Sequence, residues 1–129
     1  MQCLIVESNQ DLGHLWQRHL ERLEISVTLA TSGERALGLL QTQSFDVIVL
    51  NLVLAEGSAL AIADLAYFRQ PHANVVFVTD TTFFSDGSIF QHSANARAFI
   101  EAATPPDDLA AIVQHFGFSH HARGVRPDQ

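Results

Sequence analysis

Five short apolar runs recur along the chain at similar spacing, and none of them alternates between apolar and polar residues. They fall at residues 3–6, 27–30, 47–50, 75–78 and 98–100. A strand with one face in water alternates in this way, whereas a strand covered on both faces does not. The runs therefore predict strands that are buried on both sides of one sheet.

Segments with helical patterns separate these runs. Helices are expected at residues 11–23, from Thr31 to about Gln41, at residues 58–68 and at residues 104–116. Thr31 lies three residues before Glu34, which is the spacing of a capping box, and Thr104 stands before Pro105 as an N-cap would. Between the fourth and fifth runs, residues 81–95 contain few strong helix formers, so a short or frayed helix is expected there.

Strands that alternate with helices predict an α/β fold. Five such units favour a flavodoxin-like, doubly wound parallel sheet of five strands in the order 2-1-3-4-5, with helices on both faces. We expect one domain over residues 1–116. The polar tail, residues 117–129, lacks helical periodicity and is expected to be disordered.

Composition narrows the class of function. Apolar residues form 47% of the chain and charged residues 16%, which suffices for one core, and the net charge of −7 disfavours nucleic acid and anionic membranes as partners. No run approaches the roughly 20 apolar residues of a membrane span, and the N-terminus lacks a basic segment. A cytoplasmic protein is expected, with the single cysteine, Cys3, in its core.

The residues that follow the strands are the candidates for a functional site. In parallel sheets of this kind, sites form beyond the carboxyl ends of the strands. These positions carry Glu7, Ser8, Asn51, Thr79, Glu101 and Ala102. The seven histidines show no paired spacing of the kind that zinc sites use, so we expect no metal site from them.

In this order the strand ends resemble the receiver domains of bacterial two-component signalling. That family has an acidic pair after strand one, a phosphoacceptor Asp ending strand three, and a Thr or Ser ending strand four. An aromatic residue and then Lys-Pro mark strand five. The resemblance covers about residues 2–116: residues 45–52 are similar to the phosphoacceptor strand, and residues 99–103 stand where the aromatic residue and the lysine belong.

Three departures from the family pattern imply a degenerate phosphorylation site. The phosphoacceptor position carries Asn51, the second acidic position carries Ser8, and the lysine position carries Ala102, in a chain that has no lysine at all. Of the switch residues, Thr79 and Phe99 remain. A magnesium ion prefers several carboxylate ligands, so with Glu7 as the surviving acid of the pair we expect neither magnesium nor another cofactor.

The resemblance therefore implies a non-phosphorylatable receiver, a pseudo-receiver that acts by protein–protein interaction in a bacterial phosphorelay. Its partner would be a histidine kinase, an output protein or another signalling protein, because no DNA-binding segment follows. One alternative is a receiver phosphorylated at another acceptor, such as Ser8 or Asp80; Asp80 could instead supply a second acid for a cation. A more modest alternative is that Asn51 simply forms an Asx turn and that Glu7 is a solvated carboxylate.

A small flavodoxin-like enzyme is the alternative from another functional class. Such enzymes need a phosphate-cradling loop after strand one, whereas residues 7–13 contain two acids and one glycine. Acidic side chains repel phosphates, and the strand ends suggest no Ser-His-acid or Cys-His set, so the chain is not expected to be an enzyme.

The resemblance also suggests a working surface. Receivers commonly signal through the face made by their fourth helix, fifth strand and fifth helix, where a homodimer or a partner would bind. The segment after the fourth strand crowds together four large apolar residues: Phe83, Phe84, Ile89 and Phe90. One short helix cannot bury them all on one face, so we expect some to be exposed at an interface. Alternatively, they fold inward over the sheet.

Overall fold

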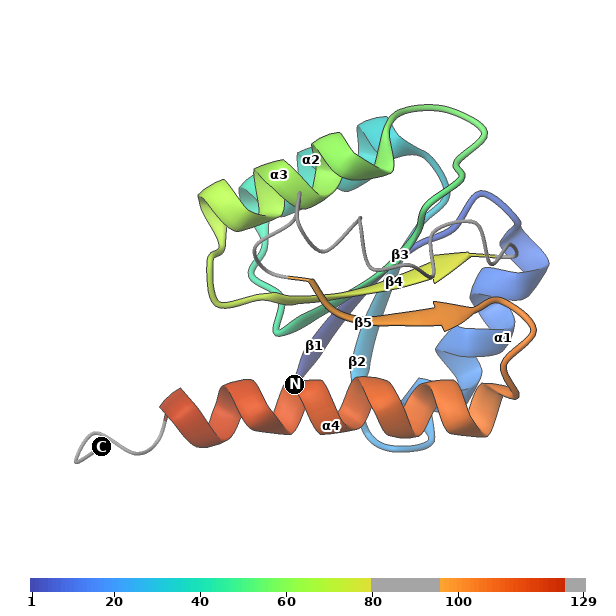
Figure 1. Ribbon diagram of the computed structural model, residues 1–129, viewed down its shortest axis with the longest axis vertical. Helices are drawn as coiled ribbons and strands as arrows, with labels where there is room; N and C mark the ends of the chain where they lie inside the picture. The colour runs from blue at the N-terminus through green and yellow to red at the C-terminus, as the bar shows by residue number, and fades with distance from the viewer. Residues whose placement is uncertain (80–95, 125–129) are drawn as a thin grey trace.

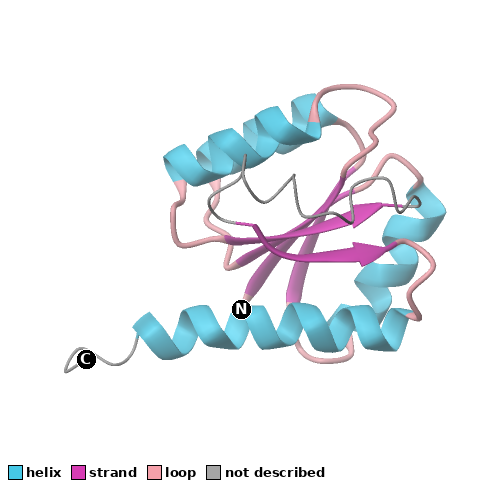
Figure 2. Ribbon diagram, in the orientation of Figure 1, coloured by secondary structure: helices cyan, strands magenta, loops and turns pink. Residues whose placement is uncertain are grey.

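The computed structural model describes the backbone of residues 1–79 and 96–124 and the side chains of residues 1–79 and 98–117. It is built around one parallel sheet of five strands in the order β2-β1-β3-β4-β5. Within the described ranges, two helices lie on each side of this sheet, α2 and α3 on one face and α1 and α4 on the other (Figures 1 and 2). The predicted fold class and strand order are confirmed.

The elements follow the predicted segments closely. The strands are β1 (Gln2–Val6), β2 (Ser26–Ala30), β3 (Val47–Asn51), β4 (Asn74–Thr79) and β5 (Ala96–Glu101). The helices are α1 (Gln10–Glu21), α2 (Gly33–Thr42), α3 (Ala59–Arg69) and α4 (Pro106–Gly124). Every strand contains the apolar run that predicted it.

Successive strand residues supply two separate cores. In β3, Ile48 and Leu50 pack with the core that α2 and α3 cover. Val47 and Val49 pack with the core that α1 and α4 cover. Because successive side chains of a strand point to opposite faces, a strand covered on both sides needs an unbroken apolar sequence. Cys3 lies in the second core, and its burial raises the pKa of its thiol.

Side chains cap the helix starts, with one correction to the prediction. Ser32, and not Thr31, caps α2, because its Oγ accepts a hydrogen bond from the Arg35 backbone N–H at 3.2 Å. Gly33 explains the choice: a Cβ there would lie 3.0 Å from the Glu56 carbonyl oxygen, so its close approach to the neighbouring loop fixes where the helix begins.

The last helix differs from the prediction at both ends. It begins at Pro106 instead of Pro105 and continues to Gly124, eight residues beyond the predicted end at residue 116. No proline interrupts the sequence between Pro106 and Pro127. Once a helix has formed, each further residue adds a hydrogen bond that offsets the entropy lost in fixing it, so weak periodicity does not end the helix.

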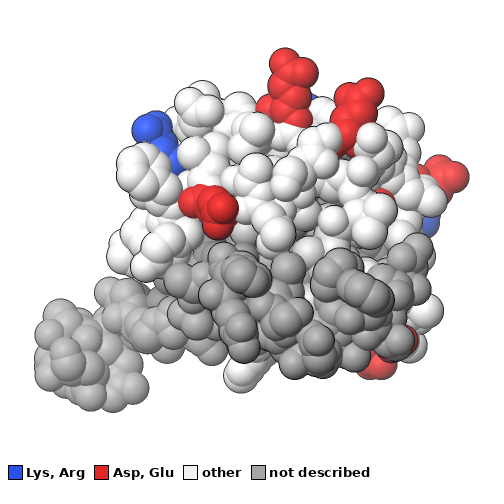
Figure 3. Space-filling model, turned by 45° about the horizontal axis from the view of Figure 1, so that its top comes forward, with Lys and Arg blue, Asp and Glu red and all other residues white. Residues whose placement is uncertain are grey.

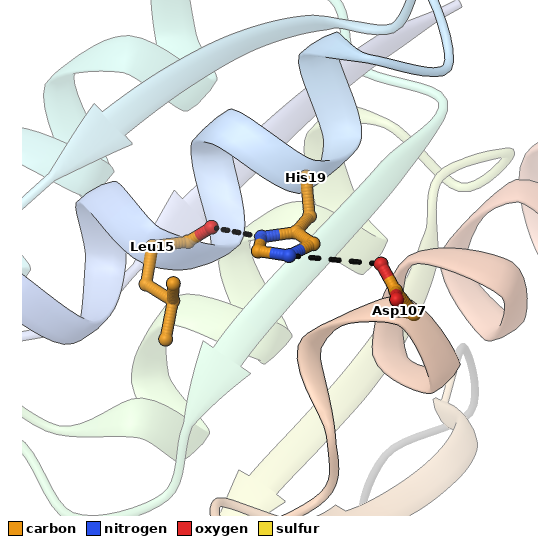
Figure 4. Close-up of polar contacts among 3 residues, drawn as sticks. All are labelled: Leu15, His19 and Asp107. Atoms are coloured by element: carbon orange, nitrogen blue, oxygen red, sulfur yellow. Dashed lines mark hydrogen bonds and ion pairs between the residues drawn. The ribbon is translucent and has the colours of Figure 1, made fainter.

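A histidine connects α1 and α4, the two helices that cover the second core. His19 of α1 lies with its Nδ1 2.9 Å from the Leu15 carbonyl oxygen and its Nε2 3.6 Å from the Asp107 carboxylate of α4 (Figure 4). A carbonyl oxygen only accepts, so Nδ1 carries a proton there. When His19 is protonated at both nitrogens, the contact to Asp107 becomes an ion pair between α1 and α4.

Several sequence predictions lie outside the described residues. They include Asp80, the expected short helix over residues 81–95 and the proposed interface residues Phe83, Phe84, Ile89 and Phe90, all of which stay predictions. Within the described ranges, no helix is both long enough and apolar enough to cross a membrane.

One side chain ties three segments together at the amino end of the sheet. Gln70, the residue after α3, accepts a hydrogen bond through Oε1 from the Phe45 backbone N–H at 2.8 Å. Its Nε2 donates to the carbonyl oxygens of Leu40, at 2.8 Å, and Gln43, at 2.6 Å. One side-chain amide therefore connects the end of α2, the segment before β3 and the end of α3.

Replacing this amide should destabilise the fold. Gln70→Ala removes three hydrogen bonds, and at about 1 kcal/mol each we expect the free energy of unfolding to fall by about 2–3 kcal/mol. Urea denaturation followed by circular dichroism measures the change. Gln41→Ala, at an exposed position of α2, is the matched control. Equal stability of the two variants would show that the Gln70 contacts contribute nothing.

Candidate functional site

The predicted site residues meet at one edge of the sheet. β1, β3 and β4 are adjacent parallel strands, with Val6 in register with Leu50 and Asn51 in register with Val78. Glu7 follows β1 directly, while Asn51 and Thr79 are the last residues of β3 and β4. Because parallel strands end at the same edge, these three residues are neighbours, as the sequence predicted.

Glu7 is the one buried acidic residue in the described part of the chain, with 3% of its surface exposed. Its Oε1 accepts a hydrogen bond from Asn51 Nδ2 at 2.7 Å. Its Oε2 accepts one from the Asn9 backbone N–H at 3.0 Å. A buried carboxylate is costly unless donors surround it, and here each of its oxygens has one. Glu7 is therefore not the solvated carboxylate that one alternative proposed.

Asn51 uses both ends of its side-chain amide. While Nδ2 donates to Glu7, Oδ1 accepts a hydrogen bond from the Val53 backbone N–H at 2.8 Å. These two partners fix which end of the amide is oxygen and which is nitrogen, because only the nitrogen can face a carboxylate. The Oδ1 contact is that of an Asx turn, so this feature of the more modest alternative is present together with the contact to Glu7.

Ser8 holds the same loop from the other side. Its Oγ accepts a hydrogen bond from the Ala55 backbone N–H at 2.8 Å. The loop between β3 and α3 is thus anchored at Val53 by Asn51 and at Ala55 by Ser8. It then turns at Gly57, whose φ of 93° lies in the region that favours glycine.

The remaining predicted positions lie around this centre. Thr79 is buried, and its carbonyl oxygen accepts a hydrogen bond from the Ala102 backbone N–H at 2.7 Å. Ala102 packs against the core beneath α1 and α4, so no charged side chain occupies the lysine position. Phe99 is half-buried and packs against the other core, with its ring centroid 6.1 Å from that of Phe77. The structure thus gives Phe99 a core role.

The described residues do not fit a magnesium ion in this arrangement. Magnesium is bound by oxygen atoms, commonly one or two carboxylates with several waters. Both carboxylate oxygens of Glu7, the Asn51 carbonyl and the Ser8 hydroxyl already accept hydrogen bonds from N–H groups. Among the described residues, no three histidine, cysteine, aspartate or glutamate side chains cluster as metal ligands would.

Sequence reasoning missed two contributors to this site. The Asn9 backbone completes the shell around Glu7, while its side chain caps α1 by accepting from the Leu12 N–H at 3.2 Å. An Asn just before a helical pattern is a recognisable cap signal. The contact between Ser8 and Ala55 joins residues 47 positions apart, and no local sequence signal announces it.

Comparison with known proteins identifies a matching family. The model of the response regulator receiver domain family matches residues 3–114. No curated protein matches the chain. Several solved structures share its fold.

Three of these structures illustrate the likeness. A CheY-like receiver domain protein from Methanospirillum hungatei has a TM-score of 0.85 at 19% identity, covering 95% of this chain and 97% of that one. The N-terminal domain of a response regulator/sensory box/GGDEF protein from Carboxydothermus hydrogenoformans has a TM-score of 0.83 at 21% identity, covering 95% and 98%. The response regulator TrrA from Thermotoga maritima, in complex with Mg²⁺-BeF, has a TM-score of 0.77 at 16% identity, covering 89% and 97%. At these identities the likeness shows the fold alone.

The contact between Asn51 and Glu7 generates a stability prediction. Asn51→Asp replaces an N–H donor by a carboxylate oxygen 2.7 Å from Glu7 Oε1. We expect the free energy of unfolding without divalent cations to fall by about 1–3 kcal/mol, because a hydrogen bond is lost and two carboxylates face each other. Millimolar magnesium should recover part of this loss, since a cation can bridge two carboxylates.

Thermal denaturation with and without magnesium measures both effects. Gln41→Glu adds one negative charge at an exposed position of α2 and serves as the control for net charge. If Asn51→Asp proves as stable as the parent chain in the absence of magnesium, the donor role of Asn51 is refuted.

Proposed function

Because the chain belongs to the response regulator receiver domain family, we propose that it is a receiver that takes no phosphate and acts by binding another protein. The observation that carries this proposal is the hydrogen bond of 2.7 Å between Asn51 Nδ2 and Glu7 Oε1. It joins the position of the phosphoacceptor to the remaining acid of the pocket. Both groups that would take part in phosphorylation are thereby engaged with each other.

The chemistry of Asn51 opposes phosphoryl transfer. A receiver forms an acyl phosphate on a carboxylate, whereas a neutral amide is a poor nucleophile. Ala102 offers no positive charge to a phosphoryl group, and the charge of Glu7, not offset by a cation, repels one. The substitutions at Asn51 and Ala102 therefore act in the same direction, which supports a site that has lost its function as a whole.

We further infer that the Asn51 amide takes over the task of a bound cation. Receiver domains of this family typically bind Mg²⁺, and the Thermotoga maritima protein is described in complex with Mg²⁺-BeF. A cation at this edge would satisfy the buried acid by its charge. Here the N–H groups of Asn51 and Asn9 satisfy Glu7, so we infer that magnesium is neither needed nor held.

A receiver that is never phosphorylated has one principal conformation in which it can bind its partners. Receiver domains are signalling modules and generally not enzymes, and the proposal follows this class. Thr79 and Phe99, the remaining switch positions, would then serve packing. The partner would be a histidine kinase, an output protein or another signalling protein, bound by the receiver domain over residues 1–116; a cytoplasmic location stays a prediction.

Intact mass after incubation with acetyl phosphate and magnesium tests the proposal. We expect no gain of mass corresponding to one phosphate, because the chain offers no carboxylate at position 51. A standard receiver run in parallel shows that the conditions suffice. A stoichiometric gain would contradict the proposal, and peptide mapping would then show whether Ser8 or Asp80, the alternative acceptors, carries the phosphate.

Two variants sharpen this test. Asn51→Asp alone should remain a poor substrate, because the second acid and the lysine are still missing. The triple variant Ser8→Asp, Asn51→Asp, Ala102→Lys restores all three positions and should take up phosphate. Efficient phosphorylation of the single variant would show that the site is less decayed than proposed.

Magnesium binding is tested separately by calorimetric titration of the parent chain. We expect no saturable site, because among the described residues both carboxylate oxygens of Glu7, Asn51 Oδ1 and Ser8 Oγ already accept hydrogen bonds. A micromolar site that Glu7→Gln abolishes would overturn the inferred role of Asn51. The control Glu34→Gln removes one exposed acid of α2 and so corrects for non-specific attraction.

A further inference from the structure

Exposed apolar side chains of the described residues gather around α3. Five large ones are at least a third exposed, and four of them belong to α3 or to the loop before it. These four, which we call the α3 face, are Val53 at 61%, Leu60 at 37%, Tyr67 at 50% and Phe68 at 79%. Most side chains on the described part of the face in Figure 3 are uncharged, although several separate Asp and Glu side chains project from it.

The sequence of α3 explains why this face is apolar. Ile62, Ala63 and Ala66 form the stripe that packs on the sheet. A surface helix normally carries polar residues opposite such a stripe, but here Leu60, Tyr67 and Phe68 face away from the core, together with the charged residues Asp64 and Arg69. A nearly fully exposed Phe beside other apolar residues is typical of a surface that a partner covers.

The α3 face carries a projection at one end and a hollow at the other. Phe68 projects at the C-terminal end of α3. At the N-terminal end, a pocket of about 390 Å³ opens between the helix and the preceding loop. Its lining is mostly apolar: Leu52, Val53, Leu54, Gly57, Ser58, Ala59 and Leu60. At a rise of about 1.5 Å per residue, Phe68 and Leu60 lie about 12 Å apart along the axis.

We propose that a second copy of this chain covers the α3 face, with the two α3 helices antiparallel across a two-fold axis. In a two-fold interface, a contact from residue i to residue j recurs from j to i. Phe68 of each copy would then enter the hollow of the other copy. Each dimer would therefore contain two contacts between a Phe68 side chain and a hollow. This dimer deepens the proposed function by naming a partner. It rests on that function only because the dimer forms without phosphorylation.

Two charges at the ends of the α3 face are complementary in the same register, while Asp64, exposed midway between Leu60 and Phe68, lies near its own copy at the axis. Arg69, next to Phe68, is exposed at the C-terminal end of α3. Glu56, next to Gly57, is exposed at the rim of the hollow. Pairing Phe68 with the hollow near Gly57 places Arg69 opposite Glu56 of the partner subunit, and the two-fold axis repeats this pair. Opposite charges at the rim set the register and disfavour the parallel arrangement.

The decayed site shapes the hollow. Val53 lines the hollow and donates its backbone N–H to Asn51 Oδ1 at 2.8 Å. The Ala55 N–H donates to Ser8 Oγ in the same loop. These two hydrogen bonds hold the wall that Phe68 would contact, so the receptor for the second copy is already formed in one chain.

Sedimentation equilibrium over a range of protein concentrations tests the proposal with the whole chain. We expect a reversible dimer in the parent. Phe68→Ser should raise its dissociation constant about 100-fold, because each dimer loses two buried aromatic contacts. The melting temperature of the variant at low concentration should stay unchanged, because Phe68 is exposed. Leu23→Ser, at an exposed apolar position after α1, should leave the dimer intact.

A charge exchange tests the register. Arg69→Glu and Glu56→Arg should each weaken the dimer, because like charges then meet across the axis. The double variant Arg69→Glu, Glu56→Arg should restore it, since each pair is again opposite in sign.

A parent chain that stays monomeric, a dimer that Phe68→Ser leaves intact, or a double variant as weak as the single ones would each overturn the proposal. Phosphorylation in the mass test leaves these outcomes unchanged, so the two proposals fail independently.

Discussion

A carboxylate that is buried away from water needs hydrogen-bond donors or a cation around it. At the edge of the sheet, this requirement determines which groups surround Glu7. The group follows β1 directly and is 3% exposed. Asn51 meets the requirement from β3, and the Asn9 backbone meets it from the start of α1. A carboxylate in place of Asn51 would add a second negative charge at 2.7 Å, which a cation or a shared proton would have to offset. The amide therefore makes the site self-sufficient.

The same amide connects the site to the surface. Because Asn51 Nδ2 faces Glu7, Oδ1 is directed toward Val53 and fixes the first part of the loop before α3. Ser8 fixes the next part at Ala55. The loop in turn forms one wall of the hollow at the start of α3. The side chains at the strand ends thus also have a structural task, since they hold the loop that lines the hollow in shape.

The sequence predicted the features that depend on local pattern and on the order of strands. Unbroken apolar runs such as 47–50 predicted β3, and the strand ends predicted that Glu7, Asn51 and Thr79 meet. Features that depend on distant contacts were not accessible. The close approach of Gly33, the first residue of α2, to another loop and the contact of Ser8 with Ala55 both exist only in the folded chain. The apolar outer face of α3 was a signal in the sequence that periodicity alone did not reveal.

The side-chain amide protons of Asn51 report most directly on the central claim that this residue occupies the role of a cation. Their signals in a ¹H–¹⁵N correlation spectrum can be assigned by their absence from an Asn51→Ala variant. We predict that they exchange slowly with solvent and do not move when millimolar magnesium is added, because both ends of the amide are engaged. A saturable shift or a loss of these signals with magnesium would contradict the claim, because it would show that a cation displaces the amide from Glu7.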